Sequence, residues 1–378
     1  MRISSGVLSV VAALCVATLC IVCGATAARS TPEAARYGWA GPELLATSTI
    51  RDQVPVFSLE STETESETEC VIRGNPLDNA TKNVQLWKAV RSVNKDADPV
   101  IEAQAIGDCT AQGAAYAVCV LSAVQIVEQL QPATWRRVHV PYIYGTARTL
   151  VGEGRLRGAD GGLGVWAAEA VRRHGVLSAD AAKAPAYSAA IARQWGDDGP
   201  PAWAIDLGAT TIVRTVARVD SASAVRDAVC NGYPVTVASR WGTRGYRQLD
   251  GRIVALGDGS WAHQMCIDGY DGSASQPLYH VRNSWGPDAH PKPIDGSPAG
   301  GFWVDTLAVS KMVAAGDSYA FSSFTGFPRQ ILGVVCDDRS TRVAVLDAGV
   351  PGDGSGDSDR VGSLWGGDRA VPPTLAGD

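Results

Sequence analysis

Apolar positions follow a helical pattern through the first half of the central region. From Thr110 to Leu130 they recur every three or four residues, with no proline and with Gly113 as the one glycine. A second run, Val165 to Arg173, has the same period and ends before Gly175, a residue type that often terminates helices. These patterns predict two helices and a largely helical first half.

From Pro234 onward the pattern changes to short runs rich in β-branched and aromatic residues, separated by Gly, Asp and Pro turns. The runs cover residues 235–238, 252–256, 265–267, 279–282 and 302–304. Runs of this length are typical of strands joined by tight turns. We therefore expect a small antiparallel sheet or barrel in the second half, and an α+β fold overall.

The N-terminus carries a different signal. An unbroken small and apolar run extends from Gly6 to Ala28, and Ala25-Thr26-Ala27 fits the small-x-small rule of signal peptidase. Residues 1–27 are therefore predicted to be a signal peptide, and the protein to be secreted or extracytoplasmic. A run of about 20 residues can also span a bilayer if it is not cut. The alternative is a membrane anchor formed by residues 6–28.

The remaining flanks lack periodic apolar positions. Ser61–Glu69 is a low-complexity acidic run, which cannot bury surface, so we interpret residues 28–83 as a low-complexity tether or a short pro-segment. Residues 330–378 are largely rich in Gly, Asp and Pro and are predicted to be a disordered tail. The folded domain is expected to span residues 84–329.

Composition narrows the classes of partner. Apolar residues make up 46% of the chain and charged residues 19%, which is enough apolar surface for a sizeable core. The formal net charge is −6 at pH 7, without the clustered Lys and Arg that phosphate backbones require. We expect a monomer with no nucleic acid partner and no cofactor.

The cysteines suggest neither a metal site nor a complete disulfide framework. Six of the nine lie outside the N-terminal apolar run: Cys70, Cys109, Cys119, Cys230, Cys266 and Cys336. Their spacing lacks the paired pattern of zinc sites, so no metal is expected. If Cys109 is a free thiol, five remain, and at least one more must stay reduced. Cys119, at helical spacing in an apolar stretch, is the candidate for a buried, inert thiol.

Cys109 is the candidate nucleophile. It stands at the start of the first predicted helix, directly after Gly107-Asp108. The free N–H groups and partial positive charge of a helix N-terminus favour thiolate over thiol, which would lower the pKa of Cys109. A nucleophilic cysteine also needs a base that accepts the thiol proton.

Histidine is the side chain suited to this role near neutral pH. The chain has five: His139, His174, His263, His280 and His290. His174 lies at the end of a predicted helix, and His139 and His290 are next to prolines in predicted loops, so none of the three requires a function. His280 is interpreted as structural. His263 begins an apolar strand and is the candidate base.

Two further residues complete a catalytic set. Asn283, in YHVRNSWG at the end of the following strand, can accept from the imidazole of His263 and fix its orientation, while Trp285 shields that bond from water. Gln104 precedes Cys109 by five residues, so its amide and the Cys109 backbone N–H could bind one oxyanion.

In these segments the chain resembles the papain-like cysteine peptidases. QAIGDCTAQGAAYA is similar to the Gln and Cys block of that family, AHQMCIDGYDG to its His block and RNSWG to its Asn block, in the same order. The resemblance covers about residues 84–328. It implies a two-domain fold with the active site in the cleft between a helical and a β half, and peptide hydrolysis through an acyl-enzyme on Cys109.

The resemblance also implies substrate-binding positions. Gly161 and Gly162 would bind the substrate backbone, while Ala238 and Ala262 would line the side-chain pocket. Trp285 is also predicted to contact the substrate. The chain departs from the family at Asp108, a carboxylate next to the nucleophile. Such a carboxylate would raise the thiol pKa unless its side chain turns away to cap the helix.

Two other functions agree with the same motifs. One is a catalytically inactive papain-like binding module that keeps the groove. The other is a different thiol hydrolase, such as a peptidoglycan amidase, in which a second His or an Asp usually completes the site. The NSWG segment favours the peptidase.

Overall fold

The structure is a computed structural model that describes residues 36–60, 79–98, 103–130, 133–211, 213–257 and 259–336. The α-helices are α2 Gly41–Leu45, α3 Ile50–Gln53, α5 Trp87–Val93, α6 Cys109–Glu128, α7 Val140–Thr146, α8 Gly164–His174, α9 Ala189–Asp198, α10 Ala202–Gly208, α11 Ala222–Val229 and α12 Thr306–Val313. The short turns are a 3₁₀ turn η2 Asn79–Thr81 and a π-helical turn η3 Ala147–Val151. The strands are β1 Asn83–Gln85, β2 Thr215–Arg218, β3 Val235–Gly242, β4 Gly245–Leu249, β5 Arg252–Leu256, β6 Gly259–Asp271, β7 Leu278–Arg282, β8 Gly301–Asp305 and β9 Asp317–Ser322.

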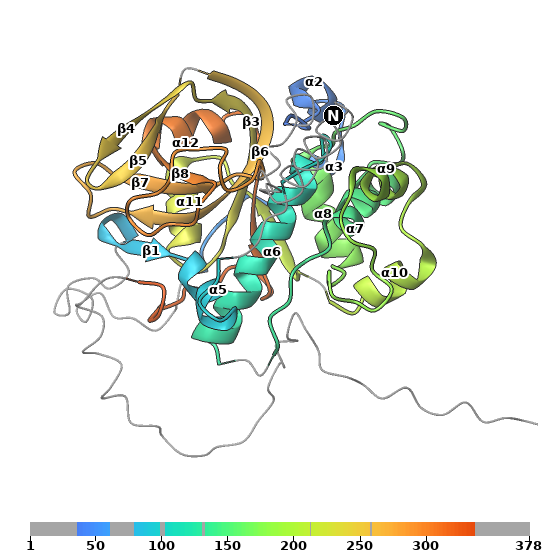
Figure 1. Cartoon of the computed structure of the whole chain (residues 1–378), viewed down its shortest axis with the longest axis horizontal. Helices are drawn as coiled ribbons and strands as arrows, with labels where there is room; N and C mark the ends of the chain where they lie inside the picture. Colours follow the sequence, from blue (N-terminus) through green and yellow to red (C-terminus); the bar gives the residue numbers. More distant parts are fainter. Residues whose placement is uncertain are drawn as a thin grey trace, which may run out of the picture.

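Helix α6 is the central element of the fold. It stands between the sheet and the helices α7, α8, α9 and α10 (Figure 1) and packs against α5, α7, α8 and β6. All of its residues from Cys109 to Gln125 are buried, because the helix is apolar around its whole circumference. By length and composition it could cross a membrane, yet 89% of its most apolar window is buried inside the protein, as in the core helix of a globular domain.

Helix α8 connects the helical half to the sheet. It ends before Gly175, whose φ of 70° is a conformation that favours glycine. At its other end the carboxylate of Asp317, the first residue of β9, accepts from the backbone N–H groups of Gly164 (2.7 Å) and Val165 (2.8 Å). A sheet residue therefore caps this helix, which fixes the two halves relative to each other.

The sheet has the strand order β2-β9-β3-β6-β7-β8-β5-β4, with β1 paired to β6. All pairs are antiparallel except the contact of β5 with β8 at Val254 and Trp303. The end strands β2 and β4 do not pair with each other, so among the described strands the sheet is open. This confirms the α+β class and corrects the expectation of a barrel. Edge strand β2 pairs instead with the N-terminal segment, at Val56 and Arg218.

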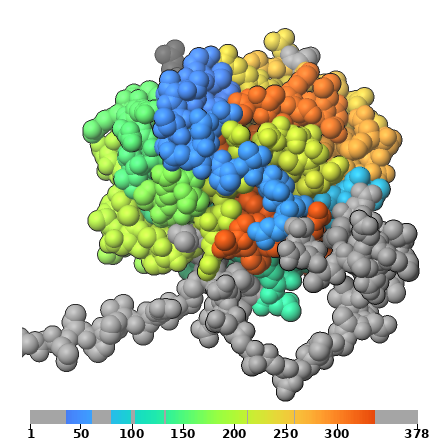
Figure 2. Space-filling view, turned by 180° about the vertical axis from the view of Figure 1, so that it is seen from behind, coloured from blue at the N-terminus to red at the C-terminus, as the bar shows by residue number. Residues whose placement is uncertain are grey.

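Residues 36–60, here called the strap, pack against the folded domain. Figure 2 shows them in blue, lying across the surface between the green helical half and the yellow and orange sheet half. Phe57 N–H donates to the Arg218 carbonyl at 2.8 Å, and Glu60 N–H to the Phe327 carbonyl at 3.0 Å. Residues 79–83 of the predicted tether include η2 and the first residue of β1, whereas residues 28–35 and 61–78 lie outside the described residues.

The first residues of the predicted C-terminal tail also contact the domain. The Glu128 carboxylate, at the end of α6, accepts from the backbone N–H groups of residues 333–335, and Cys336 pairs with Val84. Residues 337–378, like the predicted signal peptide, lie outside the described residues.

Candidate active site

Cys109 is the first residue of α6 and is completely buried. The backbone N–H of Gln264, on β6, donates to its sulfur at 3.4 Å. Burial raises the pKa of the thiol to about 12, which the backbone N–H groups around it only partly oppose. The prediction of a lowered pKa is therefore wrong for this state of the chain, because desolvation outweighs the helix N-terminus.

The Asp108 side chain does not cap the helix, and its charge contributes, after burial, to the raised pKa of Cys109. Its carboxyl group accepts from the hydroxyl of Tyr187 at 2.8 Å and faces the Gln112 amide at 3.5 Å. Burial raises the pKa of Asp108 to about 7, against the hydrogen bonds that lower it. Below neutral pH this carboxyl group therefore adds little negative charge beside Cys109.

His263 and Asn283 meet across neighbouring strands. His263 lies on β6 and Asn283 directly follows β7, which pairs with β6. The His263 Nε2 to Asn283 Oδ1 distance is 2.8 Å, and His263 is completely buried. Burial lowers the pKa of His263 to about 4, while Asn283 and the Arg36 backbone act in the opposite direction. Nδ1 has no hydrogen-bond partner of normal geometry within the described ranges.

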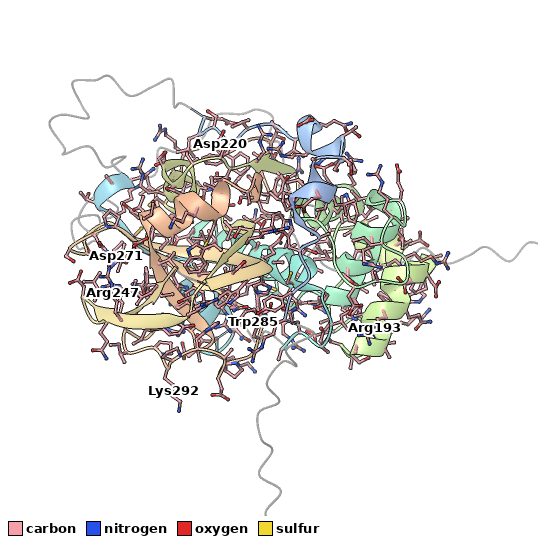
Figure 3. All side chains as sticks on the ribbon, turned by 90° about the horizontal axis from the view of Figure 1, so that it is seen from above. Arg193, Asp220, Arg247, Asp271, Trp285 and Lys292 are labelled. Carbon is pink, nitrogen blue, oxygen red and sulfur yellow. The ribbon has the colours of Figure 1, made fainter. Side chains whose placement is uncertain are left out.

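Trp285 packs directly on this pair. Its ring centroid lies 4.8 Å from that of His263, and its indole N–H donates to the Arg36 carbonyl at 2.9 Å. Figure 3 shows Trp285 between the sheet half and the helical half. The ring is only 5% exposed, so it shields the imidazole from water on this side.

Gln104 is held beside the same loop. Its Oε1 accepts from the Ser284 hydroxyl at 2.5 Å, and its Nε2 donates to the Ile106 carbonyl at 3.1 Å. The Ser284 backbone N–H in turn donates to Asn283 Oδ1 at 2.6 Å. Ser284 therefore couples the position of Gln104 to that of Asn283. A role for Gln104 at an oxyanion stays a prediction.

The two glycines predicted to bind substrate differ in what they contact. Gly162 donates its N–H to the Gly38 carbonyl at 2.8 Å and accepts from the Ala40 N–H at 2.9 Å. Gly161, at a φ of 113°, is bonded inside the protein: its N–H donates to the Tyr144 hydroxyl and its carbonyl accepts from Arg148.

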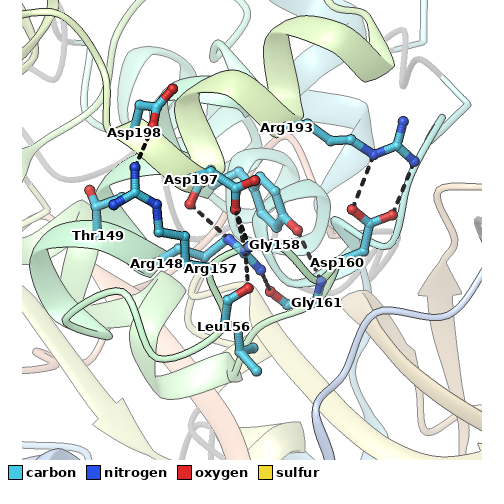
Figure 4. Close-up of polar contacts among 12 residues, drawn as sticks. Arg148, Thr149, Leu156, Arg157, Gly158, Asp160, Gly161, Arg193, Asp197 and Asp198 are labelled. Atoms are coloured by element: carbon cyan, nitrogen blue, oxygen red, sulfur yellow. Dashed lines mark hydrogen bonds and ion pairs between the residues drawn. The ribbon is translucent and has the colours of Figure 1, made fainter.

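Arg148 anchors the loop that carries these glycines. Its buried guanidinium also donates to the carbonyls of Leu156 and Gly196 and pairs with Asp197 at 3.0 Å (Figure 4). In the same loop, Asp160 pairs with Arg193 of helix α9 at 3.3 Å. These contacts hold the glycine loop in one position, with the polar groups of Gly162 directed to the strap.

The predicted pocket residues lie on the opposite wall. Ala238 is buried on β3, opposite Gln264 and Asp317 in the neighbouring strands. The Ala262 carbonyl accepts from the backbone N–H groups of Gly38 and Trp39, both at 3.1 Å. The Trp39 indole is buried and donates to the Asp317 carboxylate at 2.8 Å.

The strap thus contacts several positions predicted to bind substrate, namely Gly162, Ala262 and Trp285. It also reaches the predicted nucleophile and base, because backbone groups of Gly38 and Arg36 influence the pKa values of Cys109 and His263. Residues 36–40 therefore cover these predicted site residues in this state.

Sequence reasoning missed His290. Its Nε2 lies 2.8 Å from Asn283 Nδ2 and its Nδ1 lies 2.7 Å from the Tyr246 hydroxyl. The interpretation that His290 needs no function rested on its place between prolines, and the structure instead brings it to the far side of Asn283. The separation of seven residues between His290 and Asn283 did not predict their contact. That contact depends on the conformation of the loop between β7 and β8.

Within the described ranges, no group of three or more His, Cys, Asp or Glu side chains is arranged to hold a metal ion. The cysteines described are all free: Cys109, Cys119, Cys230, Cys266 and Cys336. Burial raises the pKa of Cys119 to about 11, in keeping with an inert thiol. Cys70 lies outside the described residues.

No family model and no curated protein matches this sequence. Among solved structures, the chain is similar to xylellain, a cysteine protease from Xylella fastidiosa, with a TM-score of 0.50 and 15% identity over 79% of this chain and 98% of that one. A second similar structure is procathepsin B S9 from Trypanosoma congolense, with a TM-score of 0.47 and 11% identity over 78% and 87% of the two chains. Similarity at this level of identity concerns the fold. The chain has the fold of the papain-like cysteine proteases, as its sequence motifs indicated.

Proposed function

We propose that this protein is a cysteine peptidase that hydrolyses peptide bonds, with Cys109 as nucleophile and His263 as general base and acid. The observation that carries the proposal is the 2.8 Å hydrogen bond from His263 Nε2 to Asn283 Oδ1. It leaves Nδ1 as the proton-accepting nitrogen of a histidine whose next residue contacts the Cys109 sulfur at 3.4 Å. The burial of Cys109, His263 and Asn283 beside one another in these contacts supports their proposed roles as nucleophile, base and orienting group.

In the proposed reaction, His263 Nδ1 takes the thiol proton and the sulfur attacks the carbonyl carbon of the scissile bond. The Cys109 backbone N–H and the Gln104 amide stabilise the oxyanion. Collapse of this intermediate expels the amine, which receives the proton from Nδ1, and leaves a thioester. Water then attacks the thioester while Nδ1 accepts its proton, and the acid product and the free thiol are released.

The substrate is proposed to lie in a cleft between the helical and the sheet half, as a two-domain papain-like arrangement requires. Gly162 would pair with its backbone, since this residue presents both an N–H and a carbonyl to an extended chain. Gly161 would support that position, and Ala238 and Ala262 would border the side-chain pocket. We propose a monomeric enzyme acting on peptides or proteins.

The strap is proposed to act as an inhibitory pro-segment. At Gly38 the strap lies very close to the Gly107 backbone: a Cβ atom on Gly38 would lie 2.2 Å from the Gly107 carbonyl oxygen. Only a residue without a side chain can take this position. The same residue donates to Ala262 and accepts from Gly162, so it joins the two walls of the cleft. A strap bound in this way would exclude substrate and keep the thiol buried.

Gly38→Ala tests both parts of the proposal. The added methyl group should displace the strap, so that hydrolysis of a fluorogenic peptide library and alkylation of Cys109 by iodoacetamide both rise by about tenfold or more. Gly333→Ala is the matched control, because the nearest atom to its Cβ is 3.8 Å away. The additional change Cys109→Ala should abolish the hydrolysis.

The other functions would give different results with the same variant. A binding module would retain peptides, measured by fluorescence polarisation, without turning them over. An amidase would release amines from peptidoglycan fragments and leave the peptide library intact. Either result, with Cys109 accessible, contradicts the proposed peptidase.

We also propose export, because of the apolar run from Gly6 to Ala28. Sequencing of protein recovered outside the expressing cell should begin at Ala28 or later. Protein that keeps Met1 and sediments with membranes would instead support the anchor.

A further inference from the structure

The hydrogen bonds around Asn283 determine which way its amide points. Ser284 donates a backbone N–H to one side-chain atom of Asn283 at 2.6 Å. A backbone N–H can only donate, so this atom must be the oxygen. The same oxygen lies 2.8 Å from His263 Nε2, which therefore carries a proton.

The other end of the amide is then its nitrogen, which can only donate. It lies 2.8 Å from His290 Nε2, so that nitrogen must be an unprotonated acceptor. The proton of the neutral imidazole is then on Nδ1, 2.7 Å from the Tyr246 hydroxyl oxygen. One backbone N–H thus implies opposite tautomers for two histidines: Nε2–H for His263 and Nδ1–H for His290.

We infer that His290 is a positioning residue that holds Asn283 with its carbonyl oxygen toward His263. The inference rests on the proposed function, in which His263 exchanges protons through Nδ1. If the amide of Asn283 rotated by half a turn, its nitrogen would face the Nε2–H of His263, and two donors would oppose each other. The acceptor on His290 disfavours that rotation, and Ser284 disfavours it from the other side.

The surroundings of His290 keep its acceptor nitrogen available. The ring is buried, with the Phe302 centroid at 4.7 Å and the Trp261 ring stacked at 6.2 Å. Burial is the largest influence on its pKa, which falls to about 3, and the charges of Arg282, Arg36 and, when it is protonated, His263 lower it further. Tyr246, the other titratable group in contact, has its pKa raised to about 12 by burial and stays neutral. His290 therefore stays unprotonated over the usual assay range.

The tautomers can be tested directly in the full chain, without any assay of activity. Imidazole ¹⁵N chemical shifts at pH 7 should identify His263 as the Nε2–H form and His290 as the Nδ1–H form. In His290→Leu, the side-chain amide protons of Asn283 should exchange faster, because their acceptor is lost. An Nε2–H tautomer at His290, or unchanged exchange in the variant, overturns the inference.

The kinetic test uses the Gly38→Ala chain as parent. His290→Leu should lower kcat by about 10- to 100-fold, the range found when a partner that orients a catalytic ligand is removed, with KM within about twofold. His290→Gln, whose side-chain oxygen can accept from Asn283, should recover most of that loss. His139→Leu is the control: this buried histidine bonds the Pro185 carbonyl and should leave kcat unchanged.

The pH dependence of Cys109 alkylation separates positioning from a purely structural role. In His290→Leu the Asn283 oxygen is no longer held in place, so the His263 imidazolium loses its hydrogen-bond partner. The pH range in which the Cys109 thiolate and the His263 imidazolium coexist should then become narrower at both its lower and its upper limit. A merely structural role would lower Tm and leave the window unchanged, which contradicts the inference. A narrowed window in a parent that hydrolyses no peptide would refute the peptidase and leave the positioning role intact.

A double-mutant cycle provides the last test. If His290 acts only through Asn283, then His290→Leu should have little further effect in an Asn283→Ala background. If the decreases in kcat from the two substitutions multiply in the double variant, His290 acts independently of Asn283, and the inference is wrong.

Discussion

Two buried polar networks cross the same pair of strands, β6 and β7, and differ in one chemical respect. The amide network runs from Tyr246 through His290 and Asn283 to His263. The carboxylate network runs from Tyr116 through Asp268 to His280. Each joins a tyrosine to a strand histidine that is completely buried, but the central group is a neutral amide in the first and a carboxylate in the second.

The difference lies also in what surrounds each histidine. His280 bonds Asp268 at 2.6 Å and is packed between Trp87 and Trp303, with the Gly301 backbone against its Nε2. Within the described residues, the hydrogen bond and ring contacts of His280 involve none of the predicted catalytic residues. His263 instead precedes the residue that contacts the Cys109 sulfur. The two buried strand histidines therefore differ in their partner, a carboxylate for His280 and a neutral amide for His263, and in their position relative to the predicted nucleophile.

The largest expected effect comes from removing each histidine in the Gly38→Ala chain. His263→Ala should lower kcat/KM by about 10⁴-fold, the upper end of what general acid–base catalysis supplies. His280→Leu should leave the turnover of folded protein unchanged but lower the free energy of unfolding by about 3 kcal/mol or more, because Asp268 loses its partner in a buried site. Steady-state kinetics and urea unfolding distinguish the two. Similar decreases in kcat/KM in both variants would contradict the proposed difference between His263 and His280.

Gln104→Ala is expected to have the next largest effect. Gln104 is connected to the amide network through Ser284. If its amide binds the oxyanion, kcat should fall by about 10²- to 10³-fold, since this bond strengthens only as charge develops. Cys109 alkylation should change little. A decrease in kcat/KM below about threefold would show that another donor stabilises the oxyanion.

Sequence periodicity predicted the elements whose pattern is local. The runs at 110–130 and 165–173 correspond to α6 and α8, and the run at 252–256 has the bounds of β5. The open sheet was not predictable, because closure depends on how the end strands β2 and β4 lie and not on alternation within them. Strand β9 was missed for a related reason: it is buried throughout and shows no alternation.

The site residues that lie in sequence motifs could be predicted. The contacts that arise because a loop or the N-terminal segment folds back onto the site could not. The Cys109, His263 and Asn283 segments could be read directly. His290 reaches Asn283 only through the conformation of the loop before β8. The strap binds through the backbones of Gly38 and Ala40, and backbone hydrogen bonds carry almost no side-chain signal. The predicted pKa of Cys109 was wrong because its complete burial, which depends on the tertiary fold, cannot be read from the local sequence.

Substitutions at Asn283 should lower kcat less than those at His263 or Gln104. They also test the difference between the amide and the carboxylate network. Asn283→Ala should fold normally and lower kcat by about 10- to 100-fold, because the imidazole keeps its chemistry but loses its orientation. Asn283→Asp converts the amide network into a carboxylate one. Its negative charge should raise the pKa of His263 and move the upper limit of the Cys109 alkylation window to higher pH. An unchanged upper limit would mean that Asn283 is not the partner of His263 in solution.

The smallest expected effect concerns stability against pH. Burial lowers the pKa of His263 to about 4 in the folded chain, whereas its ordinary value is 6.5. Below pH 6.5 the unfolded chain therefore binds the proton more readily, so the stability that is present above this pH is lost as the pH falls toward 4. Between pH 7 and 5.5 the loss from this histidine should be about 1 kcal/mol. Urea unfolding of the full chain at both pH values measures it, and His263→Gln should reduce the difference by that amount. The same pH dependence in wild type and variant would show that His263 is already solvated, and hence that the strap does not bury the amide network in solution.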